Sequence, residues 1–333
     1  MRTLRLIVVT VAGLAASVTL LAFSDIKDLK LADGHDTVNK IAAPLFDAGT
    51  VALNFSTDAT FDRAAKIVRR MSSSMFTRGP EYTLDKGVDI AKLFNEALGT
   101  ESTAMGFKAG AGTDGWKVSS TIKDIYMESR QIPYGPTLFY GYMDVAVQLT
   151  GPRGNAQSKR LHFHNYFGAY NAGLGRKDEA SEALAHLLVE SAQELTARLN
   201  REFFHAPTHR DIAARLKTLE SGVTGHENDL HMVGLSNSAA AVPVLIAAIP
   251  KDTSESRRAS MIDALARLGS ADAVKFLAGR YATEDEDCRW YSLKAMDYIG
   301  GTAALAVVKE LGAKDKDGGP KRLAERILSP IKP

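Results

Sequence analysis

Two histidines, His162 and His164, have the residue type and spacing in this sequence that come nearest to a metal site. They lie two residues apart in a segment that alternates like a β-strand, which places both imidazoles on one face. Two imidazoles on one face could bind one metal ion, but no carboxylate or third histidine has an obvious matching position. We therefore predict that both are polar residues of a sheet surface and that the protein binds no metal.

The other candidate motifs each lack a part that their chemistry needs. Residues 110–115 fit G-x-G-x-x-G, but a dinucleotide site needs a helix next, whereas a strand pattern follows, so we predict a hairpin loop. The acidic run 284–287 lacks the alternating ligands and glycine turn of a calcium loop, and it suits a helix N-terminus instead. Cys288 has no histidine at a familiar spacing, so we predict a packed structural cysteine. The sequence therefore predicts no catalytic residue, no cofactor and no enzymatic activity.

The bulk composition is that of a folded protein with more than one domain. The chain has 333 residues, of which 45% are hydrophobic and 24% are charged, and this balance argues against bulk disorder. The formal net charge is +2 and the basic residues form no long run, so we predict no nucleic-acid partner. A single cysteine, Cys288, excludes an intramolecular disulfide.

The N-terminus has the pattern of an export segment. Arg2 and Arg5 precede an uncharged apolar run over residues 6–23, and Ser24 follows. This order is typical of a secretory signal peptide, and the run is also close to the length, about 17 residues, that spans a bilayer. We therefore predict that residues 1–24 form a hydrophobic helix, either a signal peptide or a membrane anchor. In both cases the rest of the chain is expected outside the cytoplasm, periplasmic or membrane-anchored through this segment alone.

Residues 36–215 have the pattern of an α+β domain. The predicted elements are a strand at 50–56, helices at 58–75 and 84–98, strands at 116–129, 137–150 and 159–167, and a helix at 177–204. Gly99 is predicted to end the second helix. In the strand at 137–150, apolar residues such as Met143 alternate with polar residues such as Asp144, as in an antiparallel strand with one buried face. We predict an antiparallel sheet with helices on one face.

This region resembles the α/β domains of uncharacterised bacterial envelope lipoproteins and, more distantly, the amino-terminal domain of the Tol-Pal translocation protein. The resemblance is carried by the helix DIAKLFNEAL at 89–98, the hairpin at 141–167 and the closing helix at 182–199. It implies a role in assembly or scaffolding rather than catalysis. The export segment is followed by no lipobox cysteine, so a lipoprotein anchor is not expected.

Residues 222–333 contain an internal repeat of two helices. At an offset of 31 residues the sequence aligns Arg258 with Arg289, Ala264 with Ala295, Leu265 with Met296, Leu268 with Ile299, and Gly269 with Gly300. Each glycine is placed to end the first helix of its unit, and Thr283 with Glu286 is predicted to cap the next one. One unit cannot cover its own apolar face, so we predict that the units stack into a solenoid.

These aligned residues resemble HEAT repeats, particularly the phycobilisome-lyase-like class. The resemblance implies a surface that binds other proteins. We take Arg258, Arg289, Trp290 and Tyr291 as candidate protein-binding residues, because arginine and large aromatic side chains dominate binding hot spots. If the aromatic pair faces inward, it belongs to the core between repeats instead.

The sequence thus predicts a non-catalytic scaffold of the bacterial cell envelope that binds other envelope proteins through its helical repeats. Two alternatives stay open. A ligand-binding or metal-dependent protein would need a deep pocket that joins His162, His164 and Tyr166 on the polar face of the sheet. A factor that assembles lipids or lipoproteins would need an apolar groove beneath the hairpin.

Overall fold

A computed structural model of the chain describes residues 24–26, 29–31, 41–62, 67–70, 82–110, 115–131, 137–169, 179–220 and 227–329. The hydrophobic helix predicted for residues 1–24 lies outside these ranges, except for Ser24, which begins a short strand. Within the described ranges, no helix has both the length and the apolar content needed to cross a bilayer.

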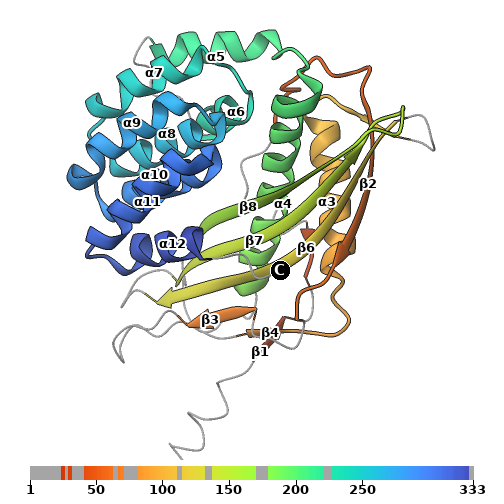
Figure 1. Ribbon diagram of the computed structural model, residues 1–333, viewed down its shortest axis with the longest axis horizontal. Helices are drawn as coiled ribbons and strands as arrows, with labels where there is room; N and C mark the ends of the chain where they lie inside the picture. The colour runs from red at the N-terminus through yellow and green to blue at the C-terminus, as the bar shows by residue number, and fades with distance from the viewer. Residues whose placement is uncertain are drawn as a thin grey trace, which may run out of the picture.

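A mixed sheet of eight strands forms the centre of the molecule (Figure 1). The strands are β1 (Ser24–Ile26), β2 (Ala52–Ala59), β3 (Val68–Arg70), β4 (Tyr82–Leu84), β5 (Lys108–Ala109), β6 (Trp116–Gln131), β7 (Thr137–Thr150) and β8 (Ala156–Ala169). The predicted antiparallel sheet is correct for β6, β7 and β8 but wrong as a whole, because β2 runs parallel to both β5 and β6. A parallel pair needs a crossover, and helix α3 (Ile90–Ala104) lies between β2 and β6 in the chain.

The segment between β5 and β6 is not the predicted hairpin loop. Both strands pair with β2, on its two opposite sides, so β5 and β6 do not form a hairpin with each other. Of the glycine motif, residues 111–114 lie outside the described residues. A Cβ atom on Gly115 would lie 2.7 Å from the carbonyl oxygen of Ala52, so this glycine permits a close approach of two backbones.

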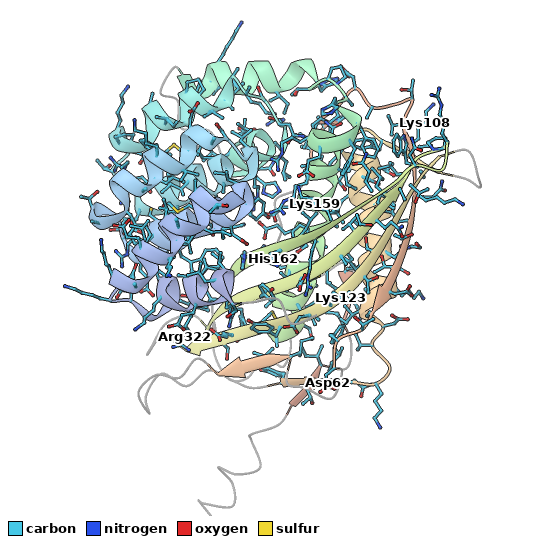
Figure 2. The ribbon with its side chains drawn as sticks, in the orientation of Figure 1. Asp62, Lys108, Lys123, Lys159, His162 and Arg322 are labelled. Carbon is cyan, nitrogen blue, oxygen red and sulfur yellow. The ribbon has the colours of Figure 1, made fainter. Side chains whose placement is uncertain are left out.

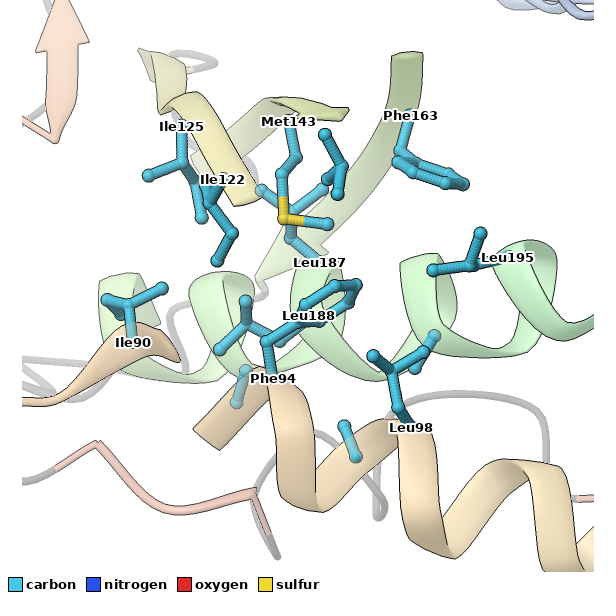
Figure 3. Packing of buried hydrophobic residues seen from close by; sticks show 14 of the residues in the cluster. Ile90, Phe94, Leu98, Ile122, Ile125, Met143, Phe163, Leu187, Leu188 and Leu195 are labelled. Carbon is cyan, nitrogen blue, oxygen red and sulfur yellow. The ribbon is translucent and has the colours of Figure 1, made fainter. Parts of the chain in front are cut away.

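Helices α3 and α4 (Glu179–Leu199) pack on one face of the sheet and form the core of the α+β region. Figure 3 shows how their apolar side chains meet those of the central strands. The buried residues in this layer include Phe94 and Leu98 of α3, Ile122 of β6, Met143 of β7, Phe163 of β8, and Leu188 and Leu195 of α4. The predicted long helix is confirmed as α4, followed by a π-helical turn η1 (Asn200–Phe204).

Helix α3 differs from its prediction at both ends. It begins after Asp89, whose carboxylate accepts a hydrogen bond from the amide of Lys92, and it continues through Gly99. A glycine inside a helix costs about 1 kcal/mol relative to alanine, and the burial of Phe94 and Leu98 in the preceding turns offsets that cost. Packing therefore overrides the local stop signal at Gly99.

The helix predicted for residues 58–75 is wrong in its described parts. Asp58 and Ala59 belong to β2, and Val68 to Arg70 form β3. Val68 pairs with Tyr82 of β4 and with Met127 of β6. Because a short apolar run fits a buried strand as well as a helix turn, only pairing with distant strands decides between them.

Eight further helices in the described part of the chain form the C-terminal region. They are α5 (Arg210–Glu220), α6 (Glu227–Leu235), α7 (Ala241–Ala248), α8 (Glu255–Leu268), α9 (Ala271–Arg280), α10 (Glu286–Ile299), α11 (Gly301–Lys314) and α12 (Gly318–Leu328). Helices α6, α8, α10 and α12 form an inner layer beside the sheet, and α7, α9 and α11 form an outer layer (Figure 1). Leu265, Leu268 and Met296 are buried between the layers, as the stacked-repeat prediction requires.

The ends of the repeat helices follow the predicted pattern with one correction. Gly269 ends α8 in the left-handed conformation, at φ 65° and ψ 33°. The cap of α10 is Asp285 rather than Thr283, because the Asp285 carboxylate accepts from the amide of Cys288. The hydroxyl of Thr283 instead donates to the carbonyl of Arg280.

The repeats lie against the second face of the sheet, so the prediction of helices on one face is also wrong. Tyr140 and Asp144, which alternate with the core residues of β7, are only 6% and 3% exposed. Trp290 of α10 contacts Tyr140, with ring centroids 6.0 Å apart. The polar face around Tyr140 and Asp144 is therefore an internal surface, whereas Gln148 and Ser158 toward the tip of the hairpin are exposed.

Two glycine substitutions form a matched pair that tests how closely the helices pack, one between α11 and α12 and one on α3. A Cβ atom on Gly312 would lie 2.2 Å from Cβ of Ala324, so Gly312→Ala should push α11 away from α12 and lower the free energy of unfolding by about 1–3 kcal/mol. A Cβ atom on Gly99 meets nothing within 4 Å, so Gly99→Ala should raise it by about 0.5–1 kcal/mol. Urea denaturation measures both, and a change of the same sign in both variants would contradict the packing.

Candidate functional site

The predicted histidine pair faces the repeats and meets a carboxylate there. His164 Nε2 lies 2.7 Å from Asp297 Oδ2, and His162 Nδ1 lies 3.6 Å from Asp297 Oδ1. Asp297 is on α10, and Figure 2 shows His162 between the sheet and the repeat helices. The carboxylate that the sequence did not reveal therefore comes from a residue 133 positions further along the chain than His164.

This contact holds the imidazole of His164 neutral and the carboxylate of Asp297 charged. Burial lowers the pKa of His164 against the opposing effect of its hydrogen bond with Asp297. Burial also disfavours the charged form of Asp297, but hydrogen bonds from His162 and His164 outweigh it and hold the pKa of that carboxyl well below its usual range. The result is a buried hydrogen-bonded acceptor that ties β8 to α10.

A second polar cluster lies deeper, where α4 meets α8 and α10. Arg267 Nε donates to Glu194 at 3.0 Å, and its Nη2 lies 2.7 Å from Asp263 and also pairs with Glu190. Lys294 Nζ lies 2.8 Å from Asp263 and 3.2 Å from Glu194. Two cations and three carboxylates are thus shared among three buried helices, and each charge faces an opposite one.

The cluster reaches α3 through a chain of hydrogen bonds. Arg267 Nη1 lies 2.7 Å from Nδ1 of His231 on α6, and His231 Nε2 lies 2.6 Å from Oε1 of Gln193. Because an arginine only donates, the neutral His231 accepts on Nδ1 and donates from Nε2. Gln193 in turn donates to Glu101 of α3 at 2.8 Å. Burial keeps the pKa of His231 well below its ordinary value, which agrees with this tautomer.

Arg258 and Arg289 occupy equivalent positions and contact the start of the following unit. Arg258 lies 3.2 Å from Glu284 and 2.9 Å from Asp285. Arg289 lies 3.1 Å from Asp315 and also pairs with Asp317. These two arginines therefore join successive repeats by ion pairs across the solenoid.

The two aromatic candidates lie side by side at the edge of the inner layer. Trp290 is 4% exposed, and its ring packs against Tyr140 of the sheet. Tyr291 is half-buried and meets Trp290 edge to face, with centroids 5.2 Å apart. Trp290 thus faces inward, whereas direct contact of Arg258, Arg289, Trp290 and Tyr291 with another protein stays a prediction.

The spaces that the two alternative functions would need are small in the described part of the structure. A gap lined by Tyr140, His164 and Trp290 between sheet and repeats has a volume of about 10 Å³, close to that of one water molecule. A gap beneath the hairpin, lined by Leu149 and Phe203 among others, has the same volume. Neither is a deep ligand pocket or a lipid groove, and the side chain of Tyr166 lies outside the described residues.

One group of possible metal ligands gathers within 4.8 Å among the described residues: Glu284, Asp285 and Cys288. Its carboxylates are already engaged, because Arg258 pairs with both and Arg280 pairs with Glu284. Burial, with the nearby carboxylate of Asp285, raises the pKa of the Cys288 thiol far above the physiological range. This group is therefore an ion-paired helix start with a neutral cysteine.

Comparison with known proteins identifies the C-terminal region. Residues 233–329 match the family description of HEAT repeats. This match supports the interpretation of these paired helices as HEAT repeats, and their narrower assignment to the phycobilisome-lyase-like class stays a prediction. No curated protein matches the chain.

Three similar solved structures each cover 46% of this chain. They are an uncharacterised protein (12% identity, TM-score 0.30, 95% of its own chain), a DUF330 protein from Xanthomonas campestris (10%, 0.32, 87%) and a minor lipoprotein from Acinetobacter baumannii (11%, 0.25, 98%). TM-scores this low carry no argument about the function of this chain.

Arg267 should be the most sensitive single position of the deep cluster. Arg267→Met introduces an unbranched apolar side chain in place of the arginine and leaves Glu190, Glu194 and Asp263 short of a cation. Removing one partner of a buried ion pair typically costs about 3–5 kcal/mol, so we expect the urea midpoint to fall accordingly. Lys314→Met, which breaks an exposed pair with Glu310, is the control and should leave the midpoint unchanged. Equal urea midpoints for both variants would contradict the stabilising role of the buried cluster.

The buried histidines should make the fold sensitive to acid. Burial lowers the pKa of His186, on α4, to about 3, against an ordinary value near 6.5. Between these values the unfolded chain binds a proton at His186 that the folded chain does not, so stability falls as the pH falls. Urea midpoints should be lower at pH 5.0 than at pH 7.5, and His186→Gln should reduce this difference.

A histidine outside the interface provides the control for the pH measurement. The imidazole of His209 lies 3.9 Å from Asp47 and takes no part in the charge cluster of α4, α8 and α10. His209→Gln should therefore keep the full difference between the two pH values. If His186→Gln also keeps it, the burial of His186 is not a source of the acid sensitivity.

Proposed function

We propose that this protein is a non-catalytic scaffold of the cell envelope that binds another protein through the outer layer of its HEAT repeats. The single observation that supports this most is that the sheet already covers the inner layer of the repeats. HEAT repeats commonly bind partners, but here α10 and α12 already lie against the sheet. The outer helices α7, α9 and α11 are left to meet a partner.

The outer helices share one pattern of exposure, which favours a continuous binding surface. Val244, Phe276 and Val307 occupy equivalent positions of the three helices and are all half-buried. Lys275 and Ala306 are exposed at the preceding equivalent positions. A row of half-exposed apolar side chains beside polar ones suits the core and rim of a protein interface.

The four residues selected from the sequence have different roles in this proposal. Arg258 and Arg289 fix the spacing between repeats through their ion pairs, and thereby the spacing of the outer helices. Trp290 anchors the repeats to the sheet. Tyr291 is half-buried on the inner-layer helix α10, so its direct contact with a partner is a prediction separate from the outer-layer surface. The envelope location rests on the sequence of residues 1–24 and is part of the same proposal.

Site-specific photo-crosslinking in the native cells tests the binding surface. We expect a benzoylphenylalanine at Lys275 or at Ala306 to crosslink one and the same protein, recovered in the envelope fraction. The same probe at Gln157, which is exposed on the distant hairpin, should not crosslink it. Lys275→Glu should reduce co-purification of that partner at least tenfold. Crosslinks from Gln157 alone, or partners found only in the cytoplasm, would contradict the proposal.

A further inference from the structure

Strand β2 carries an open edge that is independent of the repeat surface. One side of β2 pairs with β6 continuously, from Leu53 opposite Trp116 to Ala59 opposite Ile122. On its other side, β5 pairs only with Ala52 and Leu53. Figure 1 shows β2 at the border of the sheet, with no labelled strand beyond most of its length.

Backbone groups alternate in direction along a strand, and this alternation identifies which amides and carbonyls of β2 point to the open edge. The carbonyls of Val51 and Leu53 accept hydrogen bonds on the β5 side, from Lys108 and Gly110. Because backbone groups two residues apart point to the same side of a strand, the amides and carbonyls of Phe55, Thr57 and Ala59 also point away from β6. Within the described ranges, these three residues have no backbone partner on that side.

A groove runs along this edge between β2 and the first turns of α3. It has a volume of about 410 Å³ and is lined by residues 56–59 of β2 and by Asp89, Ala91, Lys92 and Asn95 of α3. Its floor is held by a hydrogen bond of 3.3 Å from Thr57 Oγ1 to Asn95 Oδ1. A strand edge beside a helix is the arrangement in which proteins bind an extended peptide by strand addition.

The charges beside the groove specify the occupant. Asp58 is exposed on β2 and Asp89 is exposed at the start of α3, while the one lysine of the lining, Lys92, lies 3.9 Å from Glu96. Pairing with a second copy of this strand would bring another Asp58 near the first, and the like charges disfavour it. An extended segment with lysine or arginine side chains would instead find opposite charges on both sides of the edge.

We propose that the β2 edge and the α3 groove bind an extended, basic segment of another protein, which adds a strand to the sheet through Phe55, Thr57 and Ala59. This interaction does not rest on the proposed function of the repeats. It would leave the outer helices accessible, so both partners could bind at once.

Selection from a phage-displayed library of random 12-residue peptides tests the proposal, with the full chain as bait. Selected peptides should be rich in lysine, arginine and β-branched residues. Thr57→Pro removes the amide that points to the open edge and spares the ladder with β6, so it should weaken binding at least tenfold. Asp58→Asn should weaken it by a similar factor, and Asp272→Asn, which removes an exposed charge on α9, should not.

A readout in the unaltered protein covers the case in which Thr57→Pro does not fold. Hydrogen exchange followed by NMR should slow at the amides of Phe55, Thr57 and Ala59 when a selected peptide binds. The proposal is overturned if no peptide is selected, if acidic peptides are selected, or if these amides keep their exchange rates. It is also overturned if sedimentation shows a dimer of this chain that protects the same amides.

Discussion

The arrangement of this molecule depends on the buried charges shared by α4, α8 and α10. Arg267 and Lys294 lose their hydration in this contact, and the carboxylates of Glu190, Glu194 and Asp263 compensate for most of that loss, together with the hydrogen bond from Arg267 to His231. Charges in a dry interior tolerate little displacement, because an unpaired one costs several kcal/mol. The cluster therefore favours one position of the repeats against the sheet. The hydrogen bond that His164 donates to Asp297, and the nearby His162, reinforce the same position closer to the surface.

The contact between repeats and sheet changes how the alternation of polar and apolar residues in β7 and β8 should be interpreted. In β7 and β8, polar residues alternate with apolar ones, a pattern that usually marks a face in water. Here His164 is 2% exposed and lies 2.7 Å from Asp297 of α10, and Asp144 is 3% exposed. Their polarity serves hydrogen bonds within the protein rather than solvation, as the Asp144 pair with Arg160 at 2.8 Å illustrates. A second domain can thus cover a polar sheet face without making it apolar, provided that it supplies the partners.

The sequence predicted the elements whose pattern is long and local, and it missed those that depend on distant pairing. The strand at 137–150, the helix α4 and the paired repeat helices each contain enough periodic residues to be recognised. The three-residue strand Val68–Arg70 does not, and only its pairing with β4 and β6 makes it a strand. The histidine pair was found by its spacing, but Asp297 was not, since nothing local to α10 encodes which sheet residues it will face.

The cost of separating sheet and repeats bears on where a partner binds. A protein that used the inner repeat layer would first have to separate Arg267 and Lys294 from their carboxylates and expose the apolar side chains packed around them. A loss of 2.8 kcal/mol already weakens binding a hundredfold. The outer helices and the β2 edge carry no such cost, because the groups there are half-exposed or open to solvent before binding. The same charges that fix the two regions together thus direct partners to the surfaces that this contact leaves uncovered.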